Sequence, residues 1–421
     1  MSTYKFCMFM ISIFLFSIAS PLVLASENSY TSEDLPPSFY LGGDSGNPYE
    51  SGNLIVSNNL ICGLTNANDI YCMVELDGNF TKVPIPSDRT VKSLTNSAAN
   101  CALLDDGSIF CFDYRMMNME INGTIVSEYQ WQVYTPILPE DRYAISIENG
   151  CVILDNYSVY CGNFLSKYHY SNPNASYVDL PDKIKILSSG GNSHCAILVN
   201  GNVYCWGQVV SNITGKEPHQ HIDIQYEYWD KPRMIQLTGK AVSIFSGPWH
   251  HCAMVVESPT WNGQSTDNLQ CWGERSVNQL GNGWFYSSDN TNWREIINAS
   301  EPVTPSFPGA WNWDYNFGDW ELENPFYGAM TLGEGFSCGV MKKNIDYSNI
   351  AIGCWGANYA PLGSDYDIYR GNQDRIFLIP ADQIGYGQPV TLAGVGPVCL
   401  INEFGELFCW GYGDNWGDSA W

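Results

Sequence analysis

Short apolar runs separated by turn residues recur along the chain, and their pattern predicts strands. The stretch HCAILVNGNVYCWG, residues 194–207, contains two such runs on either side of Asn200 and Gly201. The first run, from Ala196 to Val199, is apolar at every position, as expected for a strand covered on both faces. The runs NLIVS, KIKILSS, AVSIFSG and RIFLIP predict further strands. No stretch of useful length has helical periodicity, so an all-β fold is predicted.

The cysteines divide the chain into copies of one unit. Of the 15 cysteines, Cys7 lies near the N-terminus, and the others form seven consecutive couples. Five couples share a spacing of ten positions, which indicates an internal repeat. The couples are Cys62 and Cys72, Cys101 and Cys111, Cys151 and Cys161, Cys195 and Cys205, Cys252 and Cys271, Cys338 and Cys354, and Cys399 and Cys409.

Each couple is predicted to close a β-hairpin. In CALLDDGSIFC, pairing Cys101 with Cys111 leaves a three-residue loop that ends at Gly107. The third residue of such a loop adopts a left-handed conformation, which glycine and asparagine tolerate. Gly201, Gly405 and Asn68 occupy this place in other copies. Tyr157 occupies it in the third copy, so that turn is expected to differ.

Cysteines that face each other across two strands are close enough to form a disulfide. Zinc ligation is the alternative, but zinc sites use spacers of about two to four residues and join two pairs of ligands. No couple has that spacing. We therefore predict one disulfide in each unit.

The N-terminus has the features of a secretory leader. Residues 1–25 contain one basic residue, Lys5, then an apolar run and small residues before Ser26. Cleavage there would place the protein in an oxidising, extracellular environment that favours disulfides. The run is also long enough for an uncleaved anchor, and that alternative stays open. No second span follows, so no membrane insertion is expected after leader removal.

Six sequons would be available for N-glycosylation in a eukaryotic secretory pathway. Some can occur by chance and stay unmodified. The sites are Asn79, Asn122, Asn156, Asn174, Asn212 and Asn298.

The later copies carry a longer pattern. They read GGNSHCAILVNGNVYCWG from Gly190, CWGERSVNQLGNG from Cys271 and CWGANYAPLG from Cys354. This pattern resembles the repeat of the regulator of chromosome condensation superfamily, and its cysteine-bearing form looks most similar to the crinkly-type variant of plant receptor ectodomains. The first three copies lack the tryptophan after the second cysteine. The resemblance implies a seven-bladed β-propeller over residues 53–421.

Ring closure is predicted to involve the N-terminal segment, residues 26–52. The chain runs only eleven residues past Trp410, so the seventh blade is short of strand. An open sheet edge would leave backbone groups unpaired. We therefore expect Ser38 to Leu41 to add a strand to that blade.

Charge excludes some classes of partner. The chain has 19 basic and 44 acidic residues, a net charge of −25. The leader holds one base and no acid, so the mature chain has 18 minus 44, or −26. Nucleic acid and anionic membranes would be repelled. Only the fold of the superfamily, and not its chromatin role, is carried over.

No catalytic constellation is visible. Gly43 to Gly46 has the tetrapeptide that surrounds a trypsin-like nucleophile, but almost no mature chain precedes it to supply a histidine and an aspartate. Acidic residues are abundant throughout, so no acid/base pair is distinctive. We predict a protein that is not an enzyme and has no cofactor.

Candidate metal ligands are weak. His194 and His251 precede the first cysteine of their copies and are predicted to be structural. His219, His221 and His250 could bind a metal, although solvated loops are the default expectation. The stretch from Asp314 to Asp319 alternates oxygen ligands like a calcium loop but lacks its glycine and terminal glutamate. No metal site is predicted.

A long insertion, residues 284–327, is the predicted binding surface. Long loops on a rigid scaffold are frequent binding sites, and exposed aromatic side chains suit both sugars and protein partners. The alternative is that these rings pack over the propeller. The candidate residues, including one in the fifth hairpin, are Trp261, Trp284, Tyr286, Trp293, Trp311, Trp313, Tyr315 and Trp320.

Two functions from different classes fit these features. The first is a secreted interaction module that binds an extracellular protein through loops on one face, as propellers of the superfamily do. The second is a lectin that binds a carbohydrate or cell-wall glycan through the insertion. A lectin would retain sugars without any protein partner, and this difference separates the two.

Overall fold

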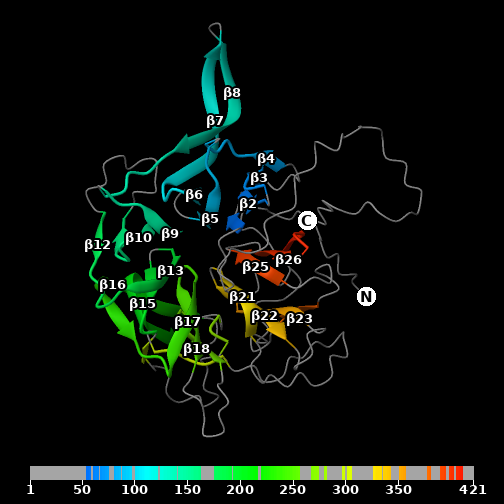
Figure 1. Ribbon diagram of the computed structural model, residues 1–421. Coiled ribbons are helices and arrows are strands. Elements are labelled where there is room, and N and C mark those ends of the chain that lie inside the picture. Colours follow the sequence, from blue (N-terminus) through cyan, green and yellow to red (C-terminus); the bar gives the residue numbers. More distant parts are fainter. Residues whose placement is uncertain are drawn as a thin grey trace, which may run out of the picture.

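The strands form seven antiparallel sheets around a ring, as a computed structural model shows (Figure 1). The structure describes residues 54–410 with internal gaps, the longest of which span residues 163–174, 257–266, 282–295, 306–325, 357–376 and 381–388. Each sheet is one blade, and its first strand lies nearest the centre of the ring (Figure 1). The predicted all-β, seven-bladed propeller is confirmed. Among the described residues, no helix is long and apolar enough to cross a membrane.

The first three blades each have four strands. Blade 1 contains β1 (Leu54–Ser57), β2 (Leu60–Leu64), β3 (Ile70–Val74) and β4 (Phe80–Lys82). Blade 2 contains β5 (Val91–Asn96), β6 (Asn100–Leu104), β7 (Ile109–Ile121) and β8 (Thr124–Tyr134). Blade 3 contains β9 (Ala144–Glu148), β10 (Cys151–Leu154), β11 (Val159–Cys161) and β12 (Ser176–Val178).

The remaining blades vary more. Blade 4 contains β13 (Ile184–Gly190), β14 (Ser193–Leu198), β15 (Val203–Lys216) and β16 (Gln220–Ile235), with β20 (Ile296–Asn298) paired to β15. Blade 5 contains β17 (Lys240–Ser246), β18 (His250–Val256) and β19 (Asp267–Gly273). Blade 6 contains β21 (Phe326–Leu332), β22 (Phe336–Lys342), β23 (Ile350–Gly356) and β24 (Phe377–Pro380). Blade 7 contains β25 (Pro389–Gly394), β26 (Val398–Asn402) and β27 (Leu407–Trp410).

Every blade holds one disulfide between its second and third strands. The seven predicted couples are all bonded, with S–S distances from 2.02 to 2.14 Å. In each couple the two cysteines are directly opposite in the strand register. The runs NLIVS, KIKILSS, AVSIFSG and RIFLIP form parts of β1, β13, β17 and β24, so those predictions are confirmed.

The predicted hairpin turns are also confirmed. Gly107, Gly201, Gly405 and Asn68 have φ angles of 80°, 80°, 79° and 61°. An added Cβ at Gly107 would lie 2.7 Å from the Cβ of Tyr143, so this position needs glycine for space as well as for conformation.

The expectation of a different turn at Tyr157 is wrong. Tyr157 adopts a φ of 64°, and its N–H donates to the Leu154 carbonyl at 2.8 Å, as in the other turns. The Asn156 Oδ1 accepts hydrogen bonds from the N–H and the Oγ of Ser158 at 3.1 and 2.6 Å. These local hydrogen bonds, together with the disulfide register, offset the strain of a left-handed residue that has a Cβ.

Neighbouring blades share apolar clusters, and blades 1 and 7 do as well. Leu54 and Val56 of blade 1 pack with Cys399 and Ile401 of blade 7 in one buried cluster. Side-chain packing therefore closes the ring within the described part of the chain. The leader, residues 26–52 and the predicted closing strand Ser38 to Leu41 lie outside the described residues.

Candidate functional site

The two arms and most long connections of the propeller lie at one end of the ring. In blades 2 to 6 they follow the third strand of the blade. Because strand direction alternates within each sheet, these connections leave every blade at the same end. The connections between second and third strands lie at the other end, and they are tight turns except in blades 5 and 6. We call these the arm end and the turn end.

One extended hairpin rises from blade 2 at the arm end, and we call it the blade 2 arm. Strands β7 and β8 pair without interruption from Cys111 opposite Tyr134 to Ile121 opposite Thr124. The arm projects well beyond the ring (Figure 1). A bulge-free ladder of this length makes a narrow, two-stranded ribbon with a continuous register.

Aromatic rings line one face of the blade 2 arm. Tyr114 stacks on Tyr129 with centroids 5.6 Å apart and contacts Trp131 at 4.9 Å. Trp131 also contacts Phe112 at 5.9 Å and packs against the buried cluster between blades 1 and 2, which anchors the base of the arm. Tyr129, farther out, is 42% exposed. The arm therefore presents an aromatic surface on a fixed base.

A second extended hairpin, the blade 4 arm, is formed by β15 and β16. Its ladder has three irregularities, and its β15 edge takes up β20, with Ile213 opposite Ile297. Strand β20 belongs to the insertion between blades 5 and 6. The blade 4 arm is thus a three-stranded structure stabilised by another part of the chain.

Three tryptophans line a cleft where the blade 4 arm meets blade 5. Trp229 comes from the arm, Trp249 from the turn before β18, and Trp272 from β19. The space inside the cleft is small, about 10 Å³, which is enough for about one water molecule. Its other lining residues are Ser193, Cys205, Gln208, Val209, Val210, His251 and Gly273.

Polar groups surround this cleft. The Arg233 guanidinium lies 4.7 Å from the centre of the Trp229 ring and donates to Glu227 at 2.8 Å. Tyr226 packs against Trp249 at 5.1 Å, and partial burial, followed by the nearby Glu274 charge, raises the pKa of its hydroxyl. Tyr228 is 67% exposed. Trp229 and Trp272 are themselves buried, so the cleft belongs to the packing between the blade 4 arm and blade 5 and has no room for a partner's side chain.

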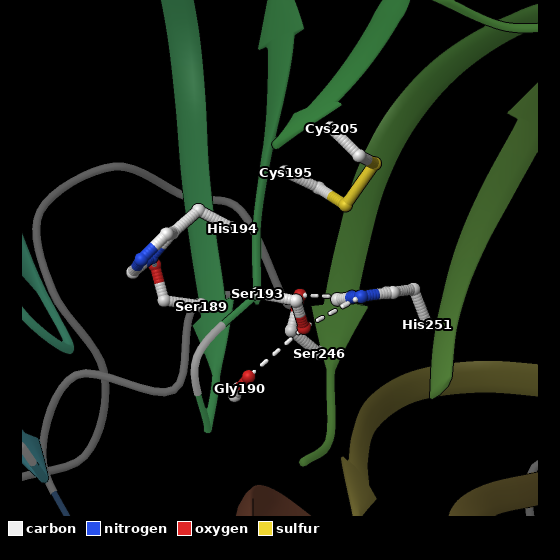
Figure 2. The surroundings of a disulfide bond; sticks show 8 residues. All are labelled: Ser189, Gly190, Ser193, His194, Cys195, Cys205, Ser246 and His251. Carbon is white, nitrogen blue, oxygen red and sulfur yellow. Dashed lines mark hydrogen bonds between the residues drawn. A yellow bond between two sulfur atoms is a disulfide. The ribbon is translucent and has the colours of Figure 1, made fainter. Parts of the chain in front are cut away.

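The histidines before the repeat cysteines are structural, as predicted. The Nδ1 atom of His194 shares a hydrogen bond with the Ser189 hydroxyl at 2.8 Å, and the His194 ring stacks on Trp206. His251 bonds Ser246 through Nδ1 at 2.9 Å and Ser193 of the neighbouring blade through Nε2 at 3.0 Å (Figure 2). Burial lowers the pKa of His194 to about 4 and that of His251 to about 3. Both rings are therefore neutral at pH 7.

The Ser193 and His251 pair has the spacing of a nucleophile and its base, but its surroundings do not suit catalysis. Ser193 is 1% exposed and His251 is 4% exposed, and the Ser193 hydroxyl lies 3.0 Å from the Gly190 carbonyl as a donor. An imidazole with a pKa of about 3 is a poor base at neutral pH. The pair joins two blades instead.

The expectation for His250 is wrong. It does not lie in a solvated loop but begins β18, is fully buried, and its Nε2 lies 2.8 Å from Ser337 Oγ. Ser337 in turn donates to the Gln279 carbonyl at 2.7 Å. His221 lies in β16, while His219 lies outside the described residues. No cluster of three potential metal ligands occurs in the described part of the chain.

The predicted binding residues lie outside the described residues, so their role stays a prediction. These are Trp261, Trp284, Tyr286, Trp293, Trp311, Trp313, Tyr315 and Trp320. The stretches Gly43 to Gly46 and Asp314 to Asp319 also lie outside the described residues. Parts of the insertion are described. Val303 forms an isolated bridge to Cys271 of β19 in blade 5, and Phe326 begins β21. Residues 284–327 therefore include structural parts of blades 4, 5 and 6, and are not one free loop between blades.

Of the sequons, three lie at described positions. Asn156 is exposed in the turn between β10 and β11, Asn212 lies in β15, and Asn298 ends β20. Asn79, Asn122 and Asn174 lie outside the described residues.

Sequence reasoning missed both arms. Their signal was present, since Tyr129, Trp131 and Val133 alternate with polar residues in β8, and Ile222, Ile224, Tyr226 and Tyr228 do so in β16. Such alternation predicts strands with one polar face. The arms were missed because these strands are longer than the strands expected in an ordinary blade.

Comparisons with known proteins agree with this architecture. No protein-family model matches the chain, and no curated protein is significantly similar in sequence. The structure of yeast RCC1 (Prp20) bound to Kap60 superposes with a TM-score of 0.55 at 14% identity, over 85% of this chain and 79% of that chain. The structure of Prp20p from Saccharomyces cerevisiae gives 0.53 at 14% identity, over 85% and 81%.

The chain has the RCC1 propeller fold. The resemblance read from the later copies is thus confirmed at the level of fold. At 14% identity the likeness does not extend to partners, because one fold supports many functions. Seven disulfides tie the blades of this chain covalently, one within each blade.

Proposed function

We propose that this chain is a secreted, non-catalytic RCC1-type propeller that binds an extracellular protein through its arm end. The two arms carry this proposal, because both present partly exposed aromatic residues on bases fixed by buried packing. Tyr129 is 42% exposed on the blade 2 arm, and Tyr226 and Tyr228 are 45% and 67% exposed on the blade 4 arm. Tyrosine and tryptophan are enriched in the contacts that dominate protein interfaces.

Secretion is supported by the leader, the sequons and the disulfides taken together. Seven intrablade disulfides would not persist in a reducing cytosol. Protein binding is supported by the neighbours, since yeast RCC1 was solved with Kap60 and the Prp20p structure was described together with its binding to Gsp1p and histones. A different, extracellular partner is expected here.

A photo-crosslinking amino acid placed at single exposed positions tests the proposal. Substitution at Tyr129 or Tyr228 should capture a protein from the extracellular fraction. Phe404 is the matched control, because it is 60% exposed but lies in the hairpin between β26 and β27 at the turn end. Capture from Phe404 alone would move the interface to the turn end and overturn the proposal.

A glycan array with the purified protein tests the lectin alternative. Retention of defined sugars, without any captured protein, would favour that function over protein binding. Simultaneous substitution of Trp311, Trp313 and Trp320 by alanine tests the predicted contribution of the insertion. The variant leaves the described strands unchanged, so loss of capture or of sugar retention would assign binding to those rings.

A further inference from the structure

We propose that the edge of β7 on the blade 2 arm that no described strand pairs with binds an extended, basic segment of the protein partner as an added β-strand. This inference rests on the proposed protein-binding function and names the binding mode and the chemistry of the partner. Strand addition is a recurrent mode of peptide recognition, in which backbone hydrogen bonds provide affinity.

The disulfide register shows which backbone groups of β7 face this edge. Cys101 and Cys111 are directly opposite, with their Cα atoms 4.0 Å apart, which identifies a non-hydrogen-bonded pair. The backbone groups of Cys111 therefore point away from β6 and toward β8. Because direction alternates along a strand, those of Tyr114, Met116 and Asn118 point to the opposite edge, beyond the end of β6.

No described strand continues the ladder along that edge. Strand β6 pairs with β7 only from Ile109 to Phe112, while β8 pairs with it as far as Ile121. Strand β7 carries the charged residues Asp113, Arg115 and Glu120. The edge is otherwise regular, since the β7 and β8 ladder has no bulge and neither strand contains proline or lysine. Natural edge strands usually carry such features to prevent unwanted pairing.

The blade 4 arm shows what such an edge accepts. The corresponding side of β15, beyond the part that pairs with β14, takes up β20 as an antiparallel strand. Asn212, seven positions after Cys205, is opposite Asn298. Asn118 stands seven positions after Cys111 in β7. The same chain thus contains one arm whose edge is filled by an extended segment and one whose equivalent edge is open among the described residues.

Charge and aromatic content indicate a basic segment. The chain has a net charge of −25, so cationic partners are attracted and a second copy of the chain is repelled. A strand added to β7 would place alternate side chains beside the ring face that contains Tyr114. Lysine or arginine over such rings gains a cation–π contact, as Arg233 does over Trp229.

Binding of a synthetic peptide tests the inference. The probe is a capped peptide of about ten residues in which valine and lysine alternate, and glutamate replaces lysine in the control peptide. Asn118→Pro removes the backbone N–H that points to the open edge of β7, and it leaves the N–H groups that bond β8 in place. Asn118→Ala is the control, because it retains this N–H. We expect the lysine peptide to bind at least about tenfold more tightly than the control, and Asn118→Pro to weaken it by about tenfold.

The outcomes are distinguishable. Equal affinity of Asn118→Pro and Asn118→Ala, with circular dichroism unchanged, would overturn strand addition at this edge. Concentration-dependent dimerisation that Asn118→Pro abolishes would assign the edge to a second copy and overturn the basic partner. If crosslinked capture through Tyr129 persists while the peptide does not bind, this inference fails and the proposed function stands. If neither occurs, both fail.

Discussion

Blades 1 to 3 and blades 4 to 6 build the same ring with different contacts between neighbours. In the first half the joins are apolar, as between blades 1 and 2, where Ile55, Leu64 and Phe110 belong to one buried cluster. In the second half, apolar clusters also join the blades, and buried histidines in addition meet serine hydroxyls of the adjacent blade. Ser193 of blade 4 meets His251 of blade 5, whereas His250 of blade 5 meets Ser337 of blade 6.

The second half also relies on glycines at the ends of its inner strands. A Cβ on Gly190 would lie 1.9 Å from the Gly247 carbonyl oxygen, and one on Gly247 would lie 2.8 Å from the Cβ of Leu332. The recurring glycine and histidine of the later copies therefore serve the joins between blades. The first copies lack this pattern yet form equal blades, so the disulfide hairpin suffices for a blade and the longer pattern specifies how blades meet.

Acidification should produce the largest difference in stability between the two halves of the ring. Burial lowers the pKa values of His194, His250 and His251 to about 4, 3 and 3, below the ordinary 6.5. The unfolded chain therefore binds more protons below pH 6.5, and stability falls from there down to the folded pKa values. At pH 5 each histidine costs about 2 kcal/mol relative to pH 7.

Glu148 in blade 3 acts in the opposite direction. Burial raises the pKa of the Glu148 carboxyl to about 8 in the folded protein. The folded chain therefore binds a proton that the unfolded chain lacks between pH 8 and 4.5, and the fold gains stability as the pH falls through this range. Protonation of Glu148 should offset about 2 kcal/mol of the stability that the three histidines lose, which leaves a net loss of about 4 kcal/mol at pH 5. Hydrogen exchange should show blades 4 to 6 losing protection first. Earlier loss in blades 1 and 2 would contradict the comparison.

The glycine joins predict the next largest effect. Gly190→Ala should destabilise the fold by about 3 kcal/mol, because two backbones must separate. Gly150→Ala is the control in blade 3, where φ is 73° but the new Cβ would meet only the Gly162 carbonyl at 3.5 Å. It should cost about 1 kcal/mol through conformation alone. Denaturant unfolding measures both, and equal losses would show that the close approach is unimportant.

Removing one hydroxyl from a polar join should have an intermediate effect. Ser193→Ala leaves His251 Nε2 buried without this partner at 3.0 Å and should cost about 2 kcal/mol. Ser108→Ala, which removes an exposed turn hydroxyl bonded to Asp106, should cost about 0.5 kcal/mol. The contrast requires thermal unfolding of both variants at pH 7. A loss at Ser193 no larger than at Ser108 would show that the polar joins do not stabilise the ring.

The smallest effect is expected at the hairpin turns of blades 3 and 4, which lie on either side of the boundary between the two halves of the ring. Tyr157→Gly in blade 3 removes left-handed strain but also the Lys183 contact at 5.4 Å, and should stabilise by under about 1 kcal/mol. The reciprocal Gly201→Tyr in blade 4 should destabilise, because its Cβ would lie 2.9 Å from the Cβ of Lys240. A loss of stability in Tyr157→Gly would show that the ring contact outweighs the strain.

The site was less predictable than the fold. Local pattern located the cysteine hairpins, and composition excluded polyanionic partners. It did not bring Trp229, Trp249 and Trp272 together, because these residues belong to two strands and one turn of two blades. The insertion was taken as one loop, because nothing local indicates that Ile297 pairs with Ile213 more than eighty positions away in the chain.

What the sequence determined by itself was the repeated hairpin. Equal cysteine spacing, a left-handed turn residue and strands apolar on both faces are local features, and each is written within about ten residues. The tertiary structure alone decided that Tyr157 could take a glycine position, that His250 would be buried against Ser337, and that β20 would fill the edge of one arm and not the other. These outcomes depend on surfaces brought together by ring closure, where burial and backbone pairing between distant residues outweigh local preference.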